Sequence, residues 1–384
     1  MRGMNSACVD LIYLDPPFNS KANYAAPIGS KAAGAAFKDT WTLTDVDVEW
    51  INLIEAKHPA LYRVLLAAMT PSDKAYLVYM SARLLEMHRI LKPTGSIYLH
   101  CDWHIGHHLK LAMDAIFGKN CFRNEIIWHY RKWPTGKYAF QRNHDVLFFY
   151  GKSAKNDHTF NQLYMPRAAS TLKRFGTGKI VSGHDKDGDR LPSVTEGESE
   201  GVRQDDVWEI GRVPPVKQIY LTQKPLELLR RVIRASSNPG DLILDPFCGC
   251  ATTCVAAQDE GRQWAGIDIS EKAAELVERR MRDELGMFTK PVHRTDIPGR
   301  TDLGKLPPYR THAPALYGLQ GGYCAGCNTH FEPRNLEVDH IIARAKGGTD
   351  HIDNLQLLCG NCNRVKGDRG MEYLRTKLQL PRAA

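Results

Sequence analysis

The stretch Val9-Asp10-Leu11-Ile12-Tyr13-Leu14-Asp15-Pro16-Pro17-Phe18 decides how most of this chain is interpreted. A run of apolar residues that favour strands ends abruptly at Asp15, which predicts a buried parallel strand followed by a stiff turn. The two prolines restrict φ, and Pro17 also biases Pro16 away from the helical region. Such a turn can hold a carboxylate, a backbone carbonyl and the ring of Phe18 around a small planar group that carries an amine. A strand followed by an ordinary proline turn is the alternative.

Length and composition limit the number of domains and the kinds of partner that the chain can have. The chain has 384 residues, enough for two domains and a sizeable core. Its formal net charge of +8 permits a polyanionic partner without requiring one. The sequence contains no signal peptide and no apolar run long enough to cross a membrane, so we expect a cytoplasmic protein without a membrane partner. Four of the ten cysteines form two Cys-x-x-Cys pairs, which favours reduced thiols and a metal site over disulfides.

Strands and helices alternate after the first strand. The pattern predicts helices over 76–91 and 104–117, and strands over 96–102, 126–130 and 146–150. This alternation indicates an α/β fold, in which a parallel sheet carries helices on both faces.

Residues 152–207 lack this periodicity and are rich in Gly, Lys, Arg and Ser. We interpret them as an inserted subdomain that faces DNA and reads its sequence, a long solvated loop being the alternative. Its basic side chains are expected near phosphates: Lys152, Lys155, Arg167, Lys173, Arg174 and Lys179.

A second buried strand, over 242–244, leads into Asp245-Pro246-Phe247-Cys248-Gly249, and the strand after the next helix ends at Asp268. A strand, a small-residue turn, a helix and a strand that ends in an acid form a βαβ nucleotide-binding unit. Asp268 has the spacing of a carboxylate that accepts hydrogen bonds from two ribose hydroxyls. Because the turn lacks the full glycine fingerprint for a pyrophosphate, it favours a cofactor with adenosine but no phosphate over NAD. An ordinary α/β crossover is the alternative.

Taken together, these motifs resemble a known family. Asp-Pro-Pro-Phe at 15–18, Gln-Lys-Pro at 223–225 and Asp-Pro-Phe-x-Gly-x-x-Thr-Thr at 245–253 resemble the β class of S-adenosylmethionine-dependent DNA amino-methyltransferases. In that family the catalytic motif precedes the cofactor motif, and a target-recognition domain lies between them. The resemblance implies a Rossmann-like methyltransferase domain over 1–288 that acts on double-stranded DNA. Relatives often form homodimers.

The resemblance also implies roles for individual residues. Asp15, Pro16, Pro17 and Phe18 would form the catalytic turn that holds a flipped-out base. Members with Asp before the two prolines mostly methylate adenine N6, so we expect adenine rather than cytosine N4. Acceptors at Asp15 and Pro16 would localise the lone pair of the amine and position its nitrogen for in-line attack on the sulfonium methyl. The cofactor contacts would come from Thr222, Gln223, Lys224, Asp245, Phe247, Gly249, Thr252 and Asp268.

The sequence departs from the family at two places. Ala251 occupies the position of the second glycine in the cofactor turn. Relatives usually carry a strand and a Gly-Asp turn before the catalytic strand, which close one side of the adenine pocket, whereas only residues 1–8 precede that strand here. The sequence therefore leaves open whether the chain binds the cofactor as its relatives do.

The C-terminal part has a different character. Residues 289–318 are proline-rich and aperiodic, which indicates a linker. After it, four cysteines in two Cys-x-x-Cys pairs predict a structural zinc site, which a small module with little apolar content needs in order to fold. These cysteines are Cys324, Cys327, Cys359 and Cys362.

Between and after these pairs, Glu337-Val338-Asp339-His340, Asn354 and Asn363 resemble the HNH, or ββα-metal, nuclease family. The resemblance implies a nuclease domain over 319–384. His340 would be the general base, Asn354 would brace the hairpin that orients it, and Asp339 and Asn363 would hold a catalytic Mg²⁺ or Mn²⁺. A structural finger with a chance histidine is the alternative. Phosphate contacts are expected from Arg344, Lys346, Arg364, Lys366 and Arg369.

The leading hypothesis is a site-specific DNA adenine methyltransferase with an appended HNH endonuclease, which methylates a site and cuts DNA that lacks the mark, as a fused restriction–modification enzyme does. One alternative is an orphan methyltransferase whose zinc module only binds DNA. The other is a truncated relic that binds nucleic acid without turnover.

Overall fold

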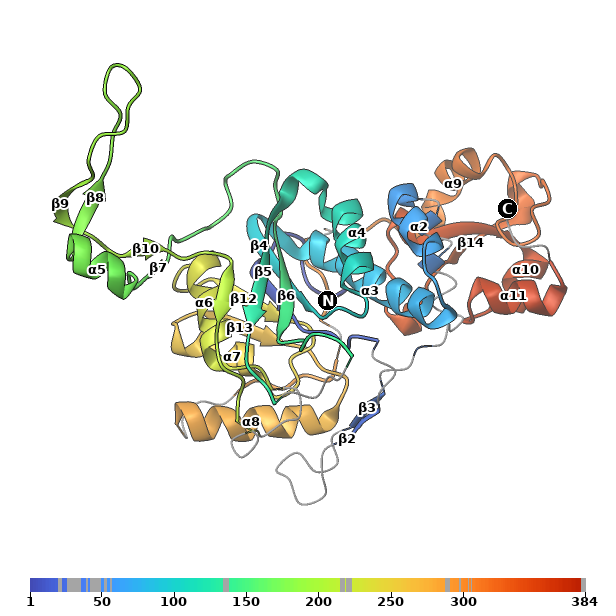
Figure 1. The fold of residues 1–384 in the computed structure, drawn as a ribbon. Coiled ribbons are helices and arrows are strands. Elements are labelled where there is room, and N and C mark those ends of the chain that lie inside the picture. The colour runs from blue at the N-terminus through green and yellow to red at the C-terminus, as the bar shows by residue number, and fades with distance from the viewer. Residues whose placement is uncertain are drawn as a thin grey trace.

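A seven-stranded mixed sheet is the centre of the N-terminal part (Figure 1), and its strand order is β11-β5-β6-β4-β1-β12-β13. The computed structural model describes residues 1–19, 23–25, 36–38, 41, 50–51, 54–55, 57–133, 138–214, 218, 223–286, 291–296, 298–302, 304 and 306–380. The strands of the sheet are β1 (Val9–Leu14), β4 (Leu91–Cys101), β5 (Phe122–His129), β6 (His144–Gly151), β11 (Val207–Glu209), β12 (Leu242–Asp245) and β13 (Gln263–Gly266).

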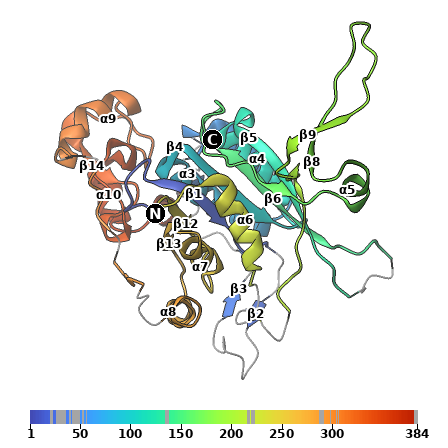
Figure 2. The same cartoon turned by 90° about the vertical axis from the view of Figure 1, so that its left-hand side faces the viewer.

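Strand β1 lies inside the sheet, parallel to both β4 and β12. Its side chains alternate between two hydrophobic cores, because helices cover both faces of the sheet (Figure 2). Ile12 and Leu14 are buried with α3 (Pro71–Ile90) and α4 (Gly106–Phe117), whereas Leu11 and Tyr13 are buried with α6 (Leu226–Ser236) and α7 (Thr252–Asp259). The predicted α/β fold with helices on both faces is confirmed.

The prediction of a wholly parallel sheet was wrong at one strand. Strand β6 runs antiparallel to both β4 and β5. The described residues between β5 and β6, 130–133 and 138–143, form no helix, and a connection without a crossover element favours antiparallel pairing. A strand that is buried in a sheet has the same apolar pattern in either direction, so periodicity alone does not reveal the difference.

Helix α3 begins five residues before the predicted start. Thr70 caps it, because its side-chain oxygen accepts a hydrogen bond from the backbone N–H of Asp73 at 3.1 Å. Pro71 occupies the first turn, where the missing N–H costs nothing.

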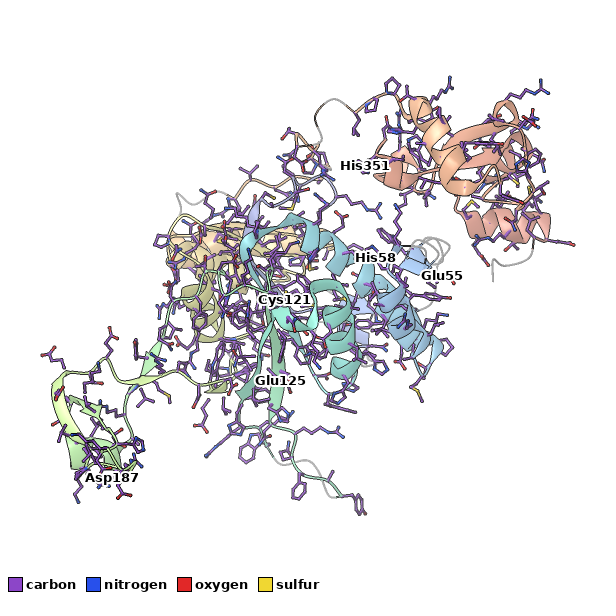
Figure 3. All side chains as sticks on the ribbon, turned by 90° about the horizontal axis from the view of Figure 1, so that it is seen from above. Glu55, His58, Cys121, Glu125, Asp187 and His351 are labelled. Atoms are coloured by element: carbon purple, nitrogen blue, oxygen red, sulfur yellow. The ribbon has the colours of Figure 1, made fainter. Side chains whose placement is uncertain are left out.

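The segment that was predicted to be an insert forms an arm that projects away from the sheet (Figure 3), with Asp187 at its far end. No residue from 152 to 207 is buried. Arg167 holds the arm together, since its guanidinium donates to the carbonyl of Gly178 at 2.6 Å and to the hydroxyl of Ser199 at 2.7 Å. The arm comprises β7 (Tyr164–Met165), α5 (Ala169–Phe175), β8 (Gly178–Val181), β9 (Val194–Glu198) and β10 (Val202–Arg203).

The C-terminal part has its own small core. The antiparallel strands β14 (Leu336–His340) and β15 (Leu355–Cys359) pack with α10 (Gly360–Lys366), α11 (Met371–Leu378) and α9 (Ala313–Gln320). Helix α9 belongs to this core through its buried Leu316, so the predicted linker over 289–318 extends too far. A short helix that opens with proline has the composition of a linker, which explains the error. Within the described residues, no helix is both long and apolar enough to span a membrane.

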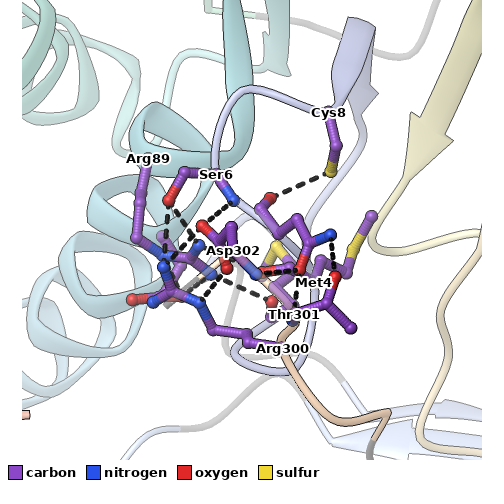
Figure 4. Close-up of polar contacts among 10 residues, drawn as sticks. Met4, Ser6, Cys8, Arg89, Arg300, Thr301 and Asp302 are labelled. Atoms are coloured by element: carbon purple, nitrogen blue, oxygen red, sulfur yellow. Dashed lines mark hydrogen bonds and ion pairs between the residues drawn. The ribbon is translucent and has the colours of Figure 1, made fainter. Parts of the chain in front are cut away.

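The segment that leads to the C-terminal core is fastened to the N-terminus (Figure 4). Asn5 bonds to the Thr301 side chain and backbone N–H at 2.8 Å each. The Ser6 N–H donates to Asp302 at 2.8 Å, and Arg300 donates to the Ser6 hydroxyl at 3.0 Å. We call this set, residues 5–6 with 300–302, the terminal clasp.

Candidate active sites

The two turns singled out in the sequence lie side by side. Strands β1 and β12 are parallel neighbours with Ile12 opposite Leu244, so Asp15 and Asp245 follow at the same edge of the sheet. Both carboxylates line one cavity of about 510 Å³, a volume that suits a nucleoside-sized ligand. The prediction that the two turns meet is confirmed.

The two oxygens of Asp15 differ in their surroundings. Oδ2 is paired with the ammonium group of Lys224. Oδ1 is buried, and no group among the described residues hydrogen-bonds to it. Leaving a buried carboxylate oxygen unsatisfied costs at least about 1–3 kcal/mol, so the site is complete only when a ligand supplies a donor. An exocyclic amine is such a donor.

Lys224 contacts the catalytic turn, which the motif did not predict. It was assigned to cofactor binding with Thr222 and Gln223, and it does line the cavity. It also completes the catalytic turn, because it pairs with Asp15 and its ammonium lies 5.6 Å from the ring centroid of Phe18. Gln223 lines the same cavity, whereas Thr222 lies outside the described residues.

Asp245 stabilises the cofactor turn from within. It is buried, and it accepts hydrogen bonds from the Thr253 hydroxyl at 2.5 Å and the Phe247 N–H at 3.1 Å. Burial raises the pKa of Asp245 from 3.8 to about 7 despite these bonds. Both its position and its partners point to a structural role beneath the cavity.

Asp268 is exposed at the end of β13, as the nucleotide-binding pattern predicted. Its oxygens accept the N–H groups of Gly249 and Ser270 at 2.9 Å each, which fix the carboxylate at the cavity wall. A carboxylate has about four lone-pair positions, so Asp268 retains acceptors for a pair of ribose hydroxyls. Phe247, Gly249 and Thr252 line the same cavity. The residues present therefore fit an adenosine-containing cofactor.

Two features of this turn were not foreseen. Ala251 adopts the left-handed conformation at φ 58°, where the family's glycine would be unstrained. The buried guanidinium of Arg280, on α8 (Glu271–Leu285), donates to the Cys250 carbonyl at 2.9 Å and the Thr252 hydroxyl at 2.8 Å. Arg280 thus fixes the turn from a helix that carries no recognisable motif, which is why the sequence did not reveal it.

A buried polar chain that the motifs did not predict runs beneath the catalytic turn. The Tyr13 hydroxyl is 2.7 Å from His100 Nδ1, and His100 Nε2 is 3.4 Å from Asp145, which also accepts from the Tyr130 hydroxyl at 3.0 Å. Burial acts to raise the pKa of Asp145, but its hydrogen bond with His100, together with the charges of His100 and Lys224, lowers the pKa below 3.8. Asp145 is therefore a fixed negative charge behind Phe18.

The four C-terminal cysteines come together as predicted. Their sulfur atoms all lie within 4.8 Å of one another, the only such group of metal-capable side chains within the described part of the chain. Burial raises the pKa of the Cys324 thiol, and the N–H groups of Gly326 and Cys359, which donate to its sulfur at 3.4 and 3.2 Å, act against this rise. Four clustered thiols fit a tetrahedral structural zinc ion. The cluster consists of Cys324, Cys327, Cys359 and Cys362.

The histidine of the C-terminal hairpin has a carboxylate partner. His340 ends β14, and its Nε2 is 2.8 Å from Asp350, a residue that sequence reasoning missed. Asn354 braces the connection between the strands, since its Nδ2 donates to the carbonyls of Ile342 at 3.0 Å and Thr349 at 2.9 Å. The loop can close this tightly only with glycine at 348, because a Cβ there would lie 1.8 Å from the Ile342 carbonyl.

The expected metal ligands lie beside this histidine. Asp339 Oδ2 accepts from Gln356 at 2.9 Å and pairs with Lys366 at 3.0 Å, and no described residue contacts Oδ1. Asn363 donates its amide to Glu337 at 2.5 Å, which leaves its carbonyl oxygen for another partner. The oxygens left over are the ligands that Mg²⁺ or Mn²⁺ prefers.

Two of the predicted phosphate contacts do not hold. Lys366 is fully buried against Asp339. Lys152 donates to the His88 carbonyl, and burial lowers its pKa to about 8. Long basic side chains bury their charge when a fixed acceptor is available, and a charge count does not reveal such acceptors.

The chain matches two protein families. The profile of the DNA methylase family matches residues 9–279, and that of the HNH endonuclease family matches residues 324–369. The first of these matches covers most of the chain. The chain therefore belongs to the DNA methylase family and carries an HNH-family domain.

Curated relatives match about 70% of the chain. The chain is 30% identical to Type II methyltransferase M.HinfI of Haemophilus influenzae over 283 residues, which cover 72% of this chain and 63% of that protein. It is 28% identical to DNA adenine methyltransferase YhdJ of Escherichia coli K12, covering 71% and 76%. It is 27% identical to Type II methyltransferase M.EcaI of Enterobacter cloacae, covering 70% of this chain and 64% of that protein. The chain thus spans under two thirds of the length of two of these relatives.

Proposed function

We propose that residues 1–288 methylate the exocyclic amine of a flipped base in double-stranded DNA, with adenine N6 favoured over cytosine N4. The observation that carries this proposal is the buried Oδ1 of Asp15, an acceptor without a partner among the described residues. It lies in the cavity where the cofactor turn also ends. Membership of the DNA methylase family, and the adenine methyltransferase YhdJ among the relatives, support the same assignment.

S-adenosylmethionine would supply an electrophilic methyl group when bound against Phe247, Gly249 and Asp268. The remaining chemistry belongs to the chain. Asp15 Oδ1 and the Pro16 carbonyl would accept the two amine hydrogens, which shifts the nitrogen lone pair out of conjugation with the ring and orients it for attack. Phe18 would stack on the base.

Lys224 has a defined part in this scheme. Its ammonium forms an ion pair with Asp15 Oδ2, so only the other carboxylate oxygen is left to accept from the amine. After methyl transfer the amine nitrogen carries an extra proton, and Asp15 is the group positioned to receive it.

A direct test uses unmethylated DNA and a labelled methyl donor. Digestion of the product to nucleosides, followed by mass spectrometry, separates N6-methyladenine from N4-methylcytosine. We expect N6-methyladenine alone. N4-methylcytosine would contradict the base assignment, and no labelled base would contradict the activity.

We further propose that the C-terminal domain is a metal-dependent DNA endonuclease stapled by zinc. Asp339 Oδ1 and the Asn363 carbonyl would hold Mg²⁺ or Mn²⁺, and His340, oriented by Asp350, would activate water. The ion would stabilise the charge that develops on the phosphate. The supporting observations are that Asp339 directly precedes His340 on β14 and that the Asn363 amide bonds to Glu337 on the same strand.

The two activities together would make a fused restriction–modification enzyme. Plasmid DNA, either unmethylated or already methylated by the protein, is incubated with Mg²⁺ or Mn²⁺ in the absence of methyl donor. Cleavage of the unmethylated plasmid alone supports this role. Cleavage of both plasmids supports a nuclease that ignores the mark, and cleavage of neither supports a zinc module that only binds DNA.

A further inference from the structure

The connection between β5 and β6 exposes large aromatic side chains beside the catalytic turn. Tyr138 is 100% exposed and Phe140 is 99% exposed. Solvent-exposed rings in a continuous group are uncommon on soluble proteins and mark an interaction surface. We call the described residues 138–142 the aromatic loop.

Arg142 of this loop stacks with two side chains that follow β4. The Arg142 guanidinium lies 3.8 Å from the ring centroid of Trp103, and the His104 ring is stacked on Trp103 at 3.9 Å. Asp102 fixes His104, accepting from its ring at 2.6 Å. Trp103 remains half exposed, so part of its ring is available to a partner.

A second cavity, of about 830 Å³, joins the aromatic loop to the catalytic turn. Phe140 and Trp103 line its outer part, and it shares Phe18 and Lys224 with the cofactor cavity. A base that enters from the aromatic loop therefore reaches Asp15 without crossing the protein core.

The charges around this second cavity favour a polyanion. Its cations are Lys132, Arg142, Arg212 and Lys224. It contains two acids, Asp102 and Asp145, and Lys224 is paired with Asp15, so the cations still outnumber the acids by one when Lys224 is left out. Cations interleaved with aromatic rings are the surface that binds unstacked nucleotides.

We propose that the aromatic loop is a wedge that opens the DNA duplex at the target base pair. Phe140 and Tyr138 enter the base stack, and Trp103 with Arg142 binds the strand as its base turns toward Asp15. Extruding a base costs a few kcal/mol of stacking and pairing, and an inserted ring replaces part of what is lost. The wedge rests on the proposed function, in that the extruded base is the one that is methylated.

Two variants test the wedge, Phe140→Ala and Trp103→Ala, both at exposed positions that leave the core intact. Methyl transfer is compared between a fully paired duplex and the same duplex mismatched at the target. We expect each variant to lose about 5- to 100-fold in kcat/KM on the paired duplex, because one aromatic–base stack contributes that much. On the mismatched duplex, where the base is already unpaired, both should approach the wild-type protein.

Two matched controls accompany these variants. Phe140→Trp keeps a ring at the tip and should retain the paired-duplex rate. Met69→Ala, at a position 82% exposed between α2 (Pro59–Leu66) and α3, should change neither rate. Equal losses on both duplexes for Phe140→Ala would overturn the wedge, and so would no loss on either.

A second readout separates failure of the wedge from failure of the proposed function. Permanganate oxidises unstacked thymines and needs no methyl donor. Wild-type protein should create reactive thymines in plasmid DNA, and Phe140→Ala should not. Reactive thymines without any methyl transfer would contradict the proposed function and support the wedge. An unchanged permanganate pattern with Phe140→Ala, or none with the wild-type protein, would contradict the wedge.

Discussion

The two sites of this chain are positioned by different forces. Asp15 and Asp245 follow strands that are buried on both faces by large hydrophobic cores. His340 ends a two-stranded hairpin whose small core is completed by four cysteines. The first site takes its rigidity from packing, whereas we propose that the second depends on a zinc ion bound by these cysteines. The two regions should therefore respond differently to metal, pH and mutation.

Removal of zinc should produce the largest difference in stability between the two regions. A structural zinc ion contributes about 10–16 kcal/mol of binding free energy that becomes folding free energy. We expect a strong chelator, or Cys359→Ser, to unfold residues 309–380 and to leave methyl transfer intact. Limited proteolysis and methyl incorporation measure the two outcomes, with Cys8→Ser as the control outside the cluster. A C-terminal domain that resists protease in chelator would contradict the zinc assignment.

His340→Ala should lower DNA cleavage by about 10²–10⁴-fold, the usual contribution of a general base, without affecting methyl transfer. Asp350→Asn should have a smaller effect in the same direction, because Asp350 acts only by orienting His340. Plasmid nicking gives the rates, and zinc content verifies that both variants are folded. If Asp350→Asn lowered the cleavage rate more than His340→Ala does, Asp350 would have a role beyond orienting His340.

The N-terminal site should respond to pH through Asp245. Its pKa is raised by burial to about 7 in the folded protein, against 3.8 unfolded, so the folded state binds more protons between these values. Stability of this domain should therefore fall as pH rises from about 4 to about 7 and level off above. Between pH 5 and pH 8 the difference is about 3 kcal/mol. Urea titrations at both pH values give the free energy of unfolding, which should change less between pH 5 and pH 8 for Asp245→Asn than for the wild-type protein. An equal change for both proteins would show that Asp245 is not the cause.

Disruption of the terminal clasp should have the smallest effect on the stability of the two domains. Asn5→Ala removes the hydrogen bonds to Thr301, which are exposed and contribute little to stability. We expect both domains to keep their Tm, while protease cuts faster near residues 300–302. A lowered Tm for either domain would mean that the clasp supports a core and does not merely connect two parts.

Much of this architecture was predictable from the sequence. Strand β1, the Asp15 turn and the cofactor turn follow from apolar runs that end at Asp-Pro, and adjacent parallel strands necessarily bring their ends together. The cysteine spacing likewise brings four sulfur atoms together. Motifs of this kind are local, so the chain reveals them directly.

What the sequence did not reveal are partners from distant elements. Lys224 reaches Asp15 across 209 positions, and Arg280 holds the cofactor turn from a helix without a motif. Lys366 has the sequence context of a phosphate ligand, but it is buried against Asp339. A single basic side chain carries no sign of the acceptor that it will meet after folding. The antiparallel direction of β6 was hidden because a buried strand has the same apolar pattern in either direction.

The central claim is that Asp15 and the cofactor turn form one methyl-transfer site, and Asp15→Asn tests it most directly. The variant keeps the size of the side chain, removes the charge beside Lys224, and does not touch the cofactor turn. Equilibrium binding of labelled S-adenosylmethionine and methyl incorporation into DNA are measured on the same preparation. We predict unchanged cofactor binding with a loss of transfer of at least about 10²-fold. Transfer at the wild-type rate would contradict the claim.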